Sequence, residues 1–275
     1  MNADICGKPK VQRLIQFFCL GFLISGCLDV GSGRLEGSRS LSNTPYGYQV
    51  VDTIARAGLL SQRFEVRAGD CGRERDGSWS DCDNDRERSE ISLWDLWEYG
   101  DNKWIGYSVF LPSDYRTSPR VKTTVGQIHQ RGGPSGTAGG LPSNPPVMQA
   151  EMLGEEYFMR VHIPSGPADN VRNGSRDIDL ARIDNMRGRW TDIAVNFDTS
   201  GGKELLAIYV NGQKRGEIRD WINFRPKDYL FKYGIYRSFV SGHNGPMPTQ
   251  ILYIDEVRLG SSMAEVMVDL ERPID

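Results

Sequence analysis

Short stretches in which apolar and polar residues alternate recur from about residue 60 to about residue 260 of this 275-residue chain. Alternation with a period of two is typical of β-strands that bury one face, and turn residues separate the stretches. The predicted strands are 63–67, 87–93, 104–111, 124–130, 147–153, 157–163, 190–197, 205–210, 214–218, 229–236 and 250–259. Segments 178–186 and 262–270 are predicted to form short helices.

The arrangement of these strands predicts the fold class. Asn211-Gly212 separates two of them and is a strong signal for a tight hairpin turn. The sequence shows no long helical period, no internal repeat and no boundary within residues 48–275. We therefore predict an all-β fold for 48–275, a single β-jelly roll in which two antiparallel sheets pack as a sandwich.

Composition and charge narrow the classes of function. Hydrophobic residues make up 39% and charged residues 25% of the chain, as in ordinary globular domains. The net charge of −3 argues against general nucleic-acid binding. An anionic ligand would therefore need a local basic cleft.

The N-terminus is predicted to be a targeting signal. Lys8, Lys10 and Arg13 precede an apolar stretch, 14–24, that is too short for an ordinary membrane span. Small residues directly before Cys27 resemble a bacterial lipobox, in which this cysteine is lipidated. We expect a lipoprotein-type signal peptide at 1–26 and a flexible tether at 27–47, hence an exported protein that meets the membrane only through a lipid anchor. The alternative is an ordinary secretory leader and a secreted protein.

The remaining cysteines are predicted to form a disulfide bond. Cys71 and Cys82 are the pair left once the leader and Cys27 are set aside, and close cysteines in an exported protein usually pair. Without nearby histidines they make a poor zinc site. The acidic run 81–85 lacks the glycine and glutamate of an EF-hand loop, so a structural calcium ion remains only as an alternative. We expect no cofactor and no catalytic metal.

Two predicted strands carry polar groups on one face. Gln127 and His129 point the same way because side chains alternate along a strand, and so do Lys232 and Tyr236. A third segment, 86–90, supplies guanidinium groups. An amide, an imidazole, an ammonium and a phenol on one surface are poorly suited to a core. They are well suited to binding and deprotonating an acidic sugar.

These segments resemble motifs of the jelly-roll polysaccharide lyases, which include alginate lyases, glucuronan lyases and the heparin lyase I type. The similar motifs are Arg88-Ser89-Glu90-Ile91, Gln127-Ile128-His129 and Tyr229-Leu230-Phe231-Lys232-Tyr233-Gly234-Ile235-Tyr236. The resemblance covers residues 60–260, and the stretches 71–90 and 253–259 look more like the glucuronan and heparin lyase I branch. Tyr233 stands where alginate lyases usually have alanine, which weakens the case for alginate. The resemblance implies a concanavalin-like sandwich.

The resemblance also implies β-elimination on a uronic-acid polysaccharide, first a glucuronate-type polymer. His129 and Tyr236 are predicted to transfer the protons, with the division into base and acid left open, and Gln127 and Arg88 to neutralise the substrate carboxylate. The residues predicted to bind substrate are Lys232, Arg131, Arg237, Tyr229 and Arg86. The expected partner is an acidic polysaccharide, the expected assembly a monomer.

Other interpretations remain open at this stage. Arg88 could instead pair with Glu90 as structural support, and the segment 131–146 is either a cover over a cleft or a plain surface loop. A carbohydrate-binding module of the same fold could use exposed tryptophans, but would not need His129 and Tyr236 together. A jelly-roll glycoside hydrolase needs paired carboxylates, and Ser92 stands where the second would follow Glu90. His162 and His243 are not favoured as catalytic residues.

Overall fold

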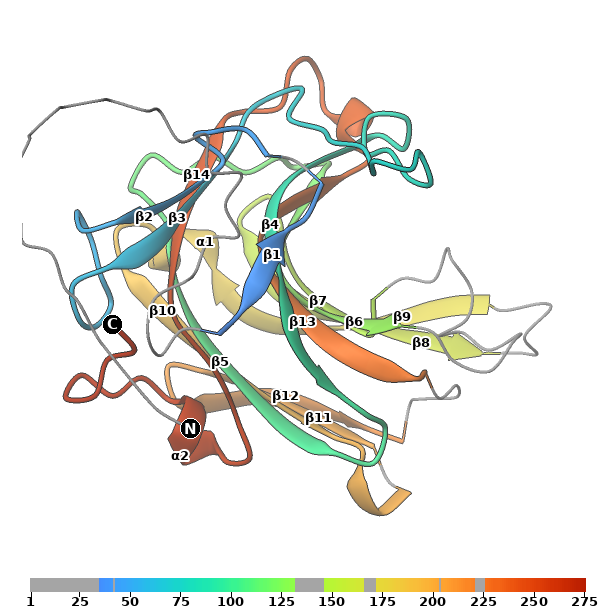
Figure 1. Cartoon of the computed structure of the whole chain (residues 1–275), viewed down its shortest axis with the longest axis vertical. Helices are drawn as coiled ribbons and strands as arrows, with labels where there is room; N and C mark the ends of the chain where they lie inside the picture. Colours follow the sequence, from blue (N-terminus) through green and yellow to red (C-terminus); the bar gives the residue numbers. More distant parts are fainter. Residues whose placement is uncertain (1–34, 42, 132–145, 166–171, 203, 221–225) are drawn as a thin grey trace, which may run out of the picture.

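The computed structural model describes residues 35–41, 43–131, 146–165, 172–202, 204–220 and 226–275. Two antiparallel sheets of seven strands stack face to face, which confirms the predicted all-β sandwich (Figure 1). The first, here called the groove sheet, has the order β1 (Gly37–Arg39), β4 (Arg86–Trp97), β13 (Asp228–Ser238), β6 (Lys122–Arg131), β7 (Met148–Leu153), β8 (Glu156–Ser165) and β9 (Arg172–Arg182). The second, the back sheet, has the order β12 (Gln213–Arg219), β11 (Leu205–Val210), β10 (Trp190–Asp198), β5 (Asn102–Phe110), β14 (Gln250–Gly260), β3 (Ser61–Val66) and β2 (Tyr48–Val51).

The core lies between the inner faces of the two sheets. Strand β13 directs Tyr229, Phe231, Tyr233 and Ile235 inward, and all four are buried. The ring of Tyr229 meets that of Phe197 from the back sheet edge to face, with centroids 4.9 Å apart. Burial of one such side chain contributes roughly 1.5–3 kcal/mol. The alternate residues of β13 face outward, so a single strand serves both core and outer surface.

The pairing register of β13 brings distant sequence segments together. Tyr236 lies opposite Arg88 of β4, and Lys232 lies opposite Gln127 of β6. The outward residues of three strands that are far apart in the sequence therefore share one patch of the sheet. This register positions the candidate site.

A glycine near the middle of β13 is required by the close approach of its neighbour. Gly234 has a φ of +132°, and a Cβ atom there would lie 2.4 Å from the carbonyl oxygen of Ser89. The pairing with β6 shifts register between Tyr233 and Tyr236, as in a β-bulge. A bulge bends its strand and re-aims the side chains beside it. Here it lies directly before Tyr236.

The predicted strands are confirmed with small shifts at their ends, but three strands were not predicted. These are β1, β2 and β9. Strand β9 covers most of the segment predicted as a helix over 178–186, and only Ile183–Met186 forms a helix, α1. The second predicted helix shortens to α2, Met263–Val266. The hairpin turn is confirmed, since Asn211 and Gly212 both have positive φ.

Strand β1 corrects the expected extent of the tether. It pairs with β4, with Gly37 opposite Leu93 and Arg39 opposite Ile91. The segment 27–47 is therefore built into the sheet from residue 37 to residue 39. The predicted leader and Cys27 lie outside the described residues, as does most of the segment 131–146.

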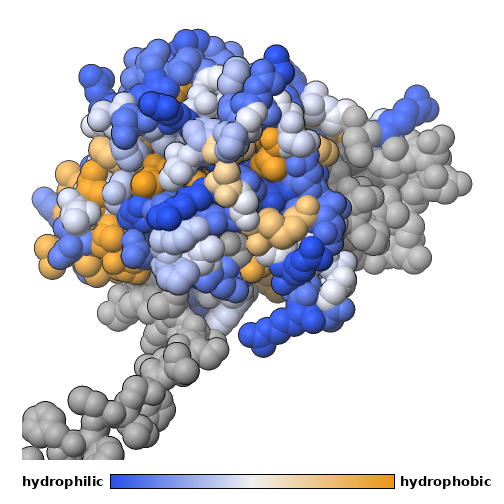
Figure 2. Space-filling model, turned by 90° about the horizontal axis from the view of Figure 1, so that it is seen from above, coloured by the Kyte–Doolittle hydropathy of each residue, from blue (hydrophilic) through white to orange (hydrophobic). Residues whose placement is uncertain are grey.

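The predicted disulfide bond is confirmed. Cys71 and Cys82 are bonded, with Cα atoms 5.1 Å apart. The bridge closes a loop at the start of β4, and this loop buries Asp81 completely. The described surface seen from above is mostly hydrophilic, with smaller apolar patches (Figure 2). Within the described residues, no helix is long and apolar enough to cross a membrane.

Candidate active site

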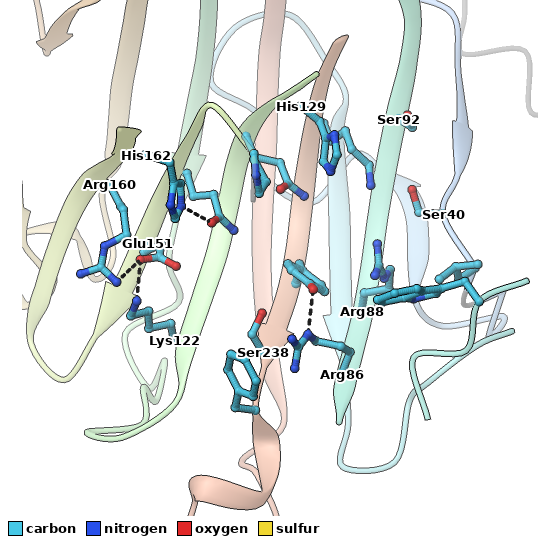
Figure 3. A pocket seen from close by; sticks show the side chains of 18 of the residues that line it. Ser40, Arg86, Arg88, Ser92, Lys122, His129, Glu151, Arg160, His162 and Ser238 are labelled. Carbon is cyan, nitrogen blue, oxygen red and sulfur yellow. Dashed lines mark hydrogen bonds and ion pairs between the residues drawn. The ribbon is translucent and has the colours of Figure 1, made fainter. Parts of the chain in front are cut away.

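The outer face of the groove sheet holds a groove of about 1020 Å³ (Figure 3). Among the described residues, seven arginine and lysine side chains line it, against two glutamates: Arg39, Arg86, Arg88, Arg120, Lys122, Arg160 and Lys232, with Glu74 and Glu151. The chain as a whole carries a net charge of −3. The groove is therefore a local basic cleft of the kind that an anionic polymer requires.

Six of the predicted site residues meet in this groove. They are Arg86, Arg88, Gln127, His129, Lys232 and Tyr236. They come from β4, β6 and β13, whose register explains their proximity. In Figure 3, His129 of β6 and Arg88 of β4, the strands on either side of β13, lie around the same pocket.

Glu90 connects three of these residues beneath the floor of the groove. Its Oε2 lies 2.8 Å from Nζ of Lys232 and 3.2 Å from Nη1 of Arg88, and its Oε1 accepts a hydrogen bond from Nε2 of Gln127. Burial alone would raise the pKa of Glu90, but Lys232 and Arg88 lower it below its ordinary value. Alternation along the strand predicted that Glu90 could pair with Arg88, but not its contacts with Lys232 and Gln127. The structure makes it the shared anchor of all three residues.

Arg88 is held more tightly than an exposed carboxylate-binding residue would be. Its Nε and Nη2 donate to the two oxygens of Asp81, at 2.5 and 2.7 Å, and Nη1 donates to Glu90. The guanidinium lies over the ring of Tyr236, 4.4 Å from its centroid. Most of its donors are thus engaged within the protein. This geometry fits a residue that orients Tyr236 and adds positive charge to the site.

His129 presents a neutral imidazole with one nitrogen open. Its Nδ1 lies 2.7 Å from the carbonyl oxygen of Gln130, and because a carbonyl only accepts, Nδ1 carries the proton. Burial, reinforced by the charge of Lys232, lowers the pKa of His129 below its ordinary value of 6.5. The lone pair is therefore on Nε2, for which no described residue supplies a hydrogen-bond donor.

Tyr236 is oriented by a donor, which leaves its own proton available. Nε of Arg86 donates to Oη of Tyr236 over 3.0 Å. Because the guanidinium cannot accept a hydrogen bond, the phenolic hydrogen is directed elsewhere. Tyr236 is half-buried and lines the groove, so this hydrogen can reach a bound ligand.

A second polar cluster lies at the far end of the groove, on β6, β7 and β8. Glu151 is buried there, with Lys122 at 3.3 Å and Arg160 at 3.5 Å from Oε2 (Figure 3). Burial, with the neighbouring Asp177, raises the pKa of Glu151 to about 8. His162 also lines the groove, which the sequence did not suggest, and burial lowers its pKa to about 4.

Three residues that were predicted to bind substrate lie elsewhere. Arg237 and Tyr229 are fully buried on the inner side of β13. Arg237 pairs with Glu87 at 2.7 Å and donates to two backbone carbonyls, so it supports the fold. Arg131 is half-exposed, pairs with Asp228 at 2.7 Å and lies outside the described lining of the groove. The expectation of substrate contact is corrected for Arg237 and Tyr229, because a buried side chain cannot reach a polymer.

Comparison with solved structures shows the same fold in several lyases. The endo-β-1,4-glucuronan lyase of the fungus Trichoderma reesei is similar over 86% of this chain and 94% of its own, with a TM-score of 0.63 and 16% identity. Alginate lyase A1-II′ is similar over 80% of this chain and 85% of its own, with a TM-score of 0.53 and 14% identity. The alginate lyase AlgAT5, of polysaccharide lyase family 7, is similar over 80% of this chain and 83% of its own, with a TM-score of 0.50 and 18% identity.

Comparison of the sequence itself identifies the family. A search among curated proteins found no match. A family model described as polysaccharide lyase matches residues 30–258, which is most of the chain and includes every strand of the groove. The chain therefore belongs to the polysaccharide lyase family, enzymes that act on polysaccharides as carbon–oxygen lyases.

Proposed function

We propose that this lyase cleaves a uronic-acid polysaccharide by β-elimination and that a glucuronate-type polymer is its substrate. One observation carries the proposal: a basic groove unites the open Nε2 of His129, the hydroxyl of Tyr236 and the ammonium of Lys232. The choice of polymer is supported by the similar fold of a protein named as a glucuronan lyase.

The proposed reaction breaks the chain without consuming water. A base takes the proton from C5, beside the uronate carboxylate, and the electrons of that bond form a double bond between C5 and C4. The bond from C4 to the glycosidic oxygen breaks, and an acid protonates the departing oxygen. The products are a new reducing end and a 4,5-unsaturated sugar.

The first requirement is to neutralise the uronate carboxylate, because its charge opposes the formation of a carbanion next to it. Lys232 is suited to this task. One of its three donors is engaged by Glu90, so two remain for the substrate. Gln127 lies opposite Lys232 in the sheet and is held by the same glutamate. Arg88 and Glu90 then act as positioning residues behind this pair.

His129 is proposed as the base and Tyr236 as the acid. His129 lines the groove, and its neutral ring has its lone pair on Nε2, as proton abstraction requires. Arg86 holds Tyr236 through its oxygen, which leaves the phenolic hydrogen for the glycosidic oxygen. In a substrate with the C5 proton and the leaving oxygen on one side of the ring, Tyr236 can serve both roles.

A panel of polymers tests the proposal. We expect wild-type enzyme to produce unsaturated ends, seen as ultraviolet absorbance, from polyglucuronate and more slowly or not at all from alginate and heparin. A neutral glucan, which has no carboxylate, is the control. His129→Ala should lower the rate about 100- to 10,000-fold on the preferred polymer. Full activity in that variant, or no unsaturated product from any polyuronide, would refute the proposal.

We also propose that the protein is exported and anchored through lipid on Cys27. The Cys71–Cys82 bond supports export, since disulfides persist in oxidising compartments. Wild-type protein expressed in bacteria should partition into the detergent phase, and Cys27→Ser should move it to the aqueous phase. Equal partition of the two forms would contradict the anchor.

A further inference from the structure

A large apolar side chain stands at the rim of the groove in a conformation that is unfavourable for it. Phe239 directly follows β13, is 66% exposed and has a φ of 60° and a ψ of 51°. The left-handed region costs a non-glycine residue roughly 1–2 kcal/mol. Exposure also denies the ring most of the stabilisation that burial provides. The fold therefore gains little from a phenylalanine here.

The backbone around Phe239 is held by contacts that do not involve its ring. The carbonyl oxygen of Asp85 accepts hydrogen bonds from the amides of Phe239 and Val240, at 2.9 and 3.3 Å. The carboxylate of Asp85 accepts from the amide and hydroxyl of Ser241, at 2.9 and 2.7 Å. Asp85 itself has a φ of 61°. Two left-handed residues thus brace each other, and their backbones fix where the ring points.

The ring lies one side chain away from the proposed acid. The guanidinium of Arg86 lies over one face of the Phe239 ring, 3.9 Å from its centroid. The same Arg86 donates to Oη of Tyr236. Phe239 also lines the groove, beside Arg86 and the proposed acid Tyr236. Arg86 covers one face of the ring, but the residue is 66% exposed, so apolar surface remains open to a ligand.

A second exposed aromatic residue lines the same groove. Trp79 is 39% exposed and projects from the disulfide loop. Its Nε1 donates to Asp81 at 3.1 Å, which fixes the indole. The described residues include several exposed large hydrophobic side chains, and the two that line the groove are both aromatic. Rigid aromatic rings with one polar attachment suit the apolar face of a sugar ring.

We propose that Phe239 and Trp79 form an aromatic subsite that stacks against sugar rings of the bound polysaccharide. Stacking uses the C–H face of a pyranose, which neutral and acidic sugars share, while the groove cations select for carboxylates. This inference adds to the proposed function. It depends on that function only for the acidic character of the polymer. Phe239 is the cleaner probe, because Trp79 also touches the carboxylate that holds Arg88.

Kinetics on short polyglucuronate oligosaccharides test the subsite. We expect Phe239→Ala to raise KM roughly three- to tenfold, with a smaller change in kcat, and Phe239→Tyr to restore the wild-type KM. Leu270→Ala, at a 65% exposed leucine outside the groove lining, is the matched control. A fall in kcat at unchanged KM would overturn the proposal, because it would mean that the ring acts only by positioning Arg86.

A stability measurement separates binding from folding. Asparagine tolerates the left-handed conformation better than phenylalanine. Phe239→Asn should therefore keep or raise the melting temperature while it raises KM as Phe239→Ala does. A large drop in melting temperature for this variant, with wild-type KM, would show that the ring serves the fold and would overturn the subsite.

A binding assay separates failure of the subsite from failure of the proposed reaction. Tyr236→Phe protein is run through gels that contain polyglucuronate or alginate, with and without Phe239→Ala. Loss of retardation on adding Phe239→Ala supports the subsite even if the wild type yields no unsaturated product. Equal retardation of both forms, or none in either gel, overturns it even if the wild type is an active lyase.

Discussion

The two faces of β13 carry similar residue types with opposite tasks. The inner face has Tyr229, Tyr233 and Arg237, all buried. Tyr233 donates a hydrogen bond to Gln62, and Arg237 donates to two backbone carbonyls. The outer face has Lys232 and Tyr236, which are half-buried and line the groove. The residue type alone therefore does not determine the role of a tyrosine or a basic residue in this strand. Its face of the sheet decides whether it serves the core or the substrate.

Tyr236 gives the strongest test of the difference between the two faces of β13. Tyr236→Phe removes only the hydroxyl that receives the Arg86 hydrogen bond. We expect the rate on polyglucuronate to fall about 100- to 10,000-fold, because the departing oxygen loses its proton donor. The melting temperature should change little. A wild-type rate in Tyr236→Phe would refute the catalytic role of Tyr236. A large drop in its melting temperature would show that the outer face supports the fold as the core does.

Arg237 should show the reverse behaviour. Arg237→Ala leaves Glu87 without its buried partner and two backbone carbonyls without a donor. We expect the free energy of unfolding to fall by about 3–5 kcal/mol, measured by urea titration. KM of the remaining folded enzyme should match the wild type. Ser238→Ala, at the next residue on the outer face, is the control and should be nearly neutral; a raised KM with normal stability in Arg237→Ala would return Arg237 to the substrate site.

Glu90 contributes both to the fold and to the groove, because it is buried and yet holds groove residues in place. Glu90→Gln keeps the shape but removes the charge that meets Lys232 and Arg88. We expect a loss of about 1–3 kcal/mol in unfolding free energy together with a lower rate. Variants that lose stability without losing rate would show that Glu90 supports only the fold.

The pH dependence of stability gives a second test of Glu90. Its pKa is lower in the folded protein than the ordinary 4.5. The folded state therefore binds fewer protons than the unfolded state in this range. The stabilisation that ionised Glu90 provides is complete above pH 4.5, and it is lost as the pH falls through the pKa of Glu90 in the folded state. Urea titrations should show a shallower acid loss in Glu90→Gln than in the wild type, and identical slopes would contradict this.

The smallest expected effect concerns the acid limb of activity. His129 must be neutral to act as a base, and burial and Lys232 lower its pKa below 6.5. The profile of kcat/KM against pH should therefore stay flat on lowering the pH past 6.5 and fall only further into acid. Lys232→Met should move this limb toward higher pH, since it removes a neighbouring positive charge. A limb already falling at 6.5 in the wild type would argue against His129 as the base.

Alternation along single strands predicted much of this arrangement. It placed Gln127 with His129 and Lys232 with Tyr236, and all four line the groove. The same rule puts Tyr229 and Arg237 on the opposite face, so the prediction that they bind substrate conflicted with the pattern itself. Family resemblance favoured the whole strand, but only alternate positions can face a ligand.

Other features needed the three-dimensional structure. Asp81 holds Arg88 because a disulfide loop folds back against β4, and no strand periodicity reports that contact. Phe239 acquires its position from hydrogen bonds to Asp85, 154 residues away in the sequence (239 − 85). The outer strands β1 and β9 were missed because they are short or polar and bury too little to impose a clear pattern.

Strand β1 has a practical consequence for anyone who trims the N-terminus. Residues 38–41 line the groove, and Arg39 adds a positive charge to that wall. A shortened protein starting at residue 48 would keep the proposed proton-transfer residues but lose this wall. It would also bare the edge of β4, an open template on which another chain can add a strand. We expect such a shortened protein to aggregate more readily and to accept a broader range of sugars than the full-length enzyme.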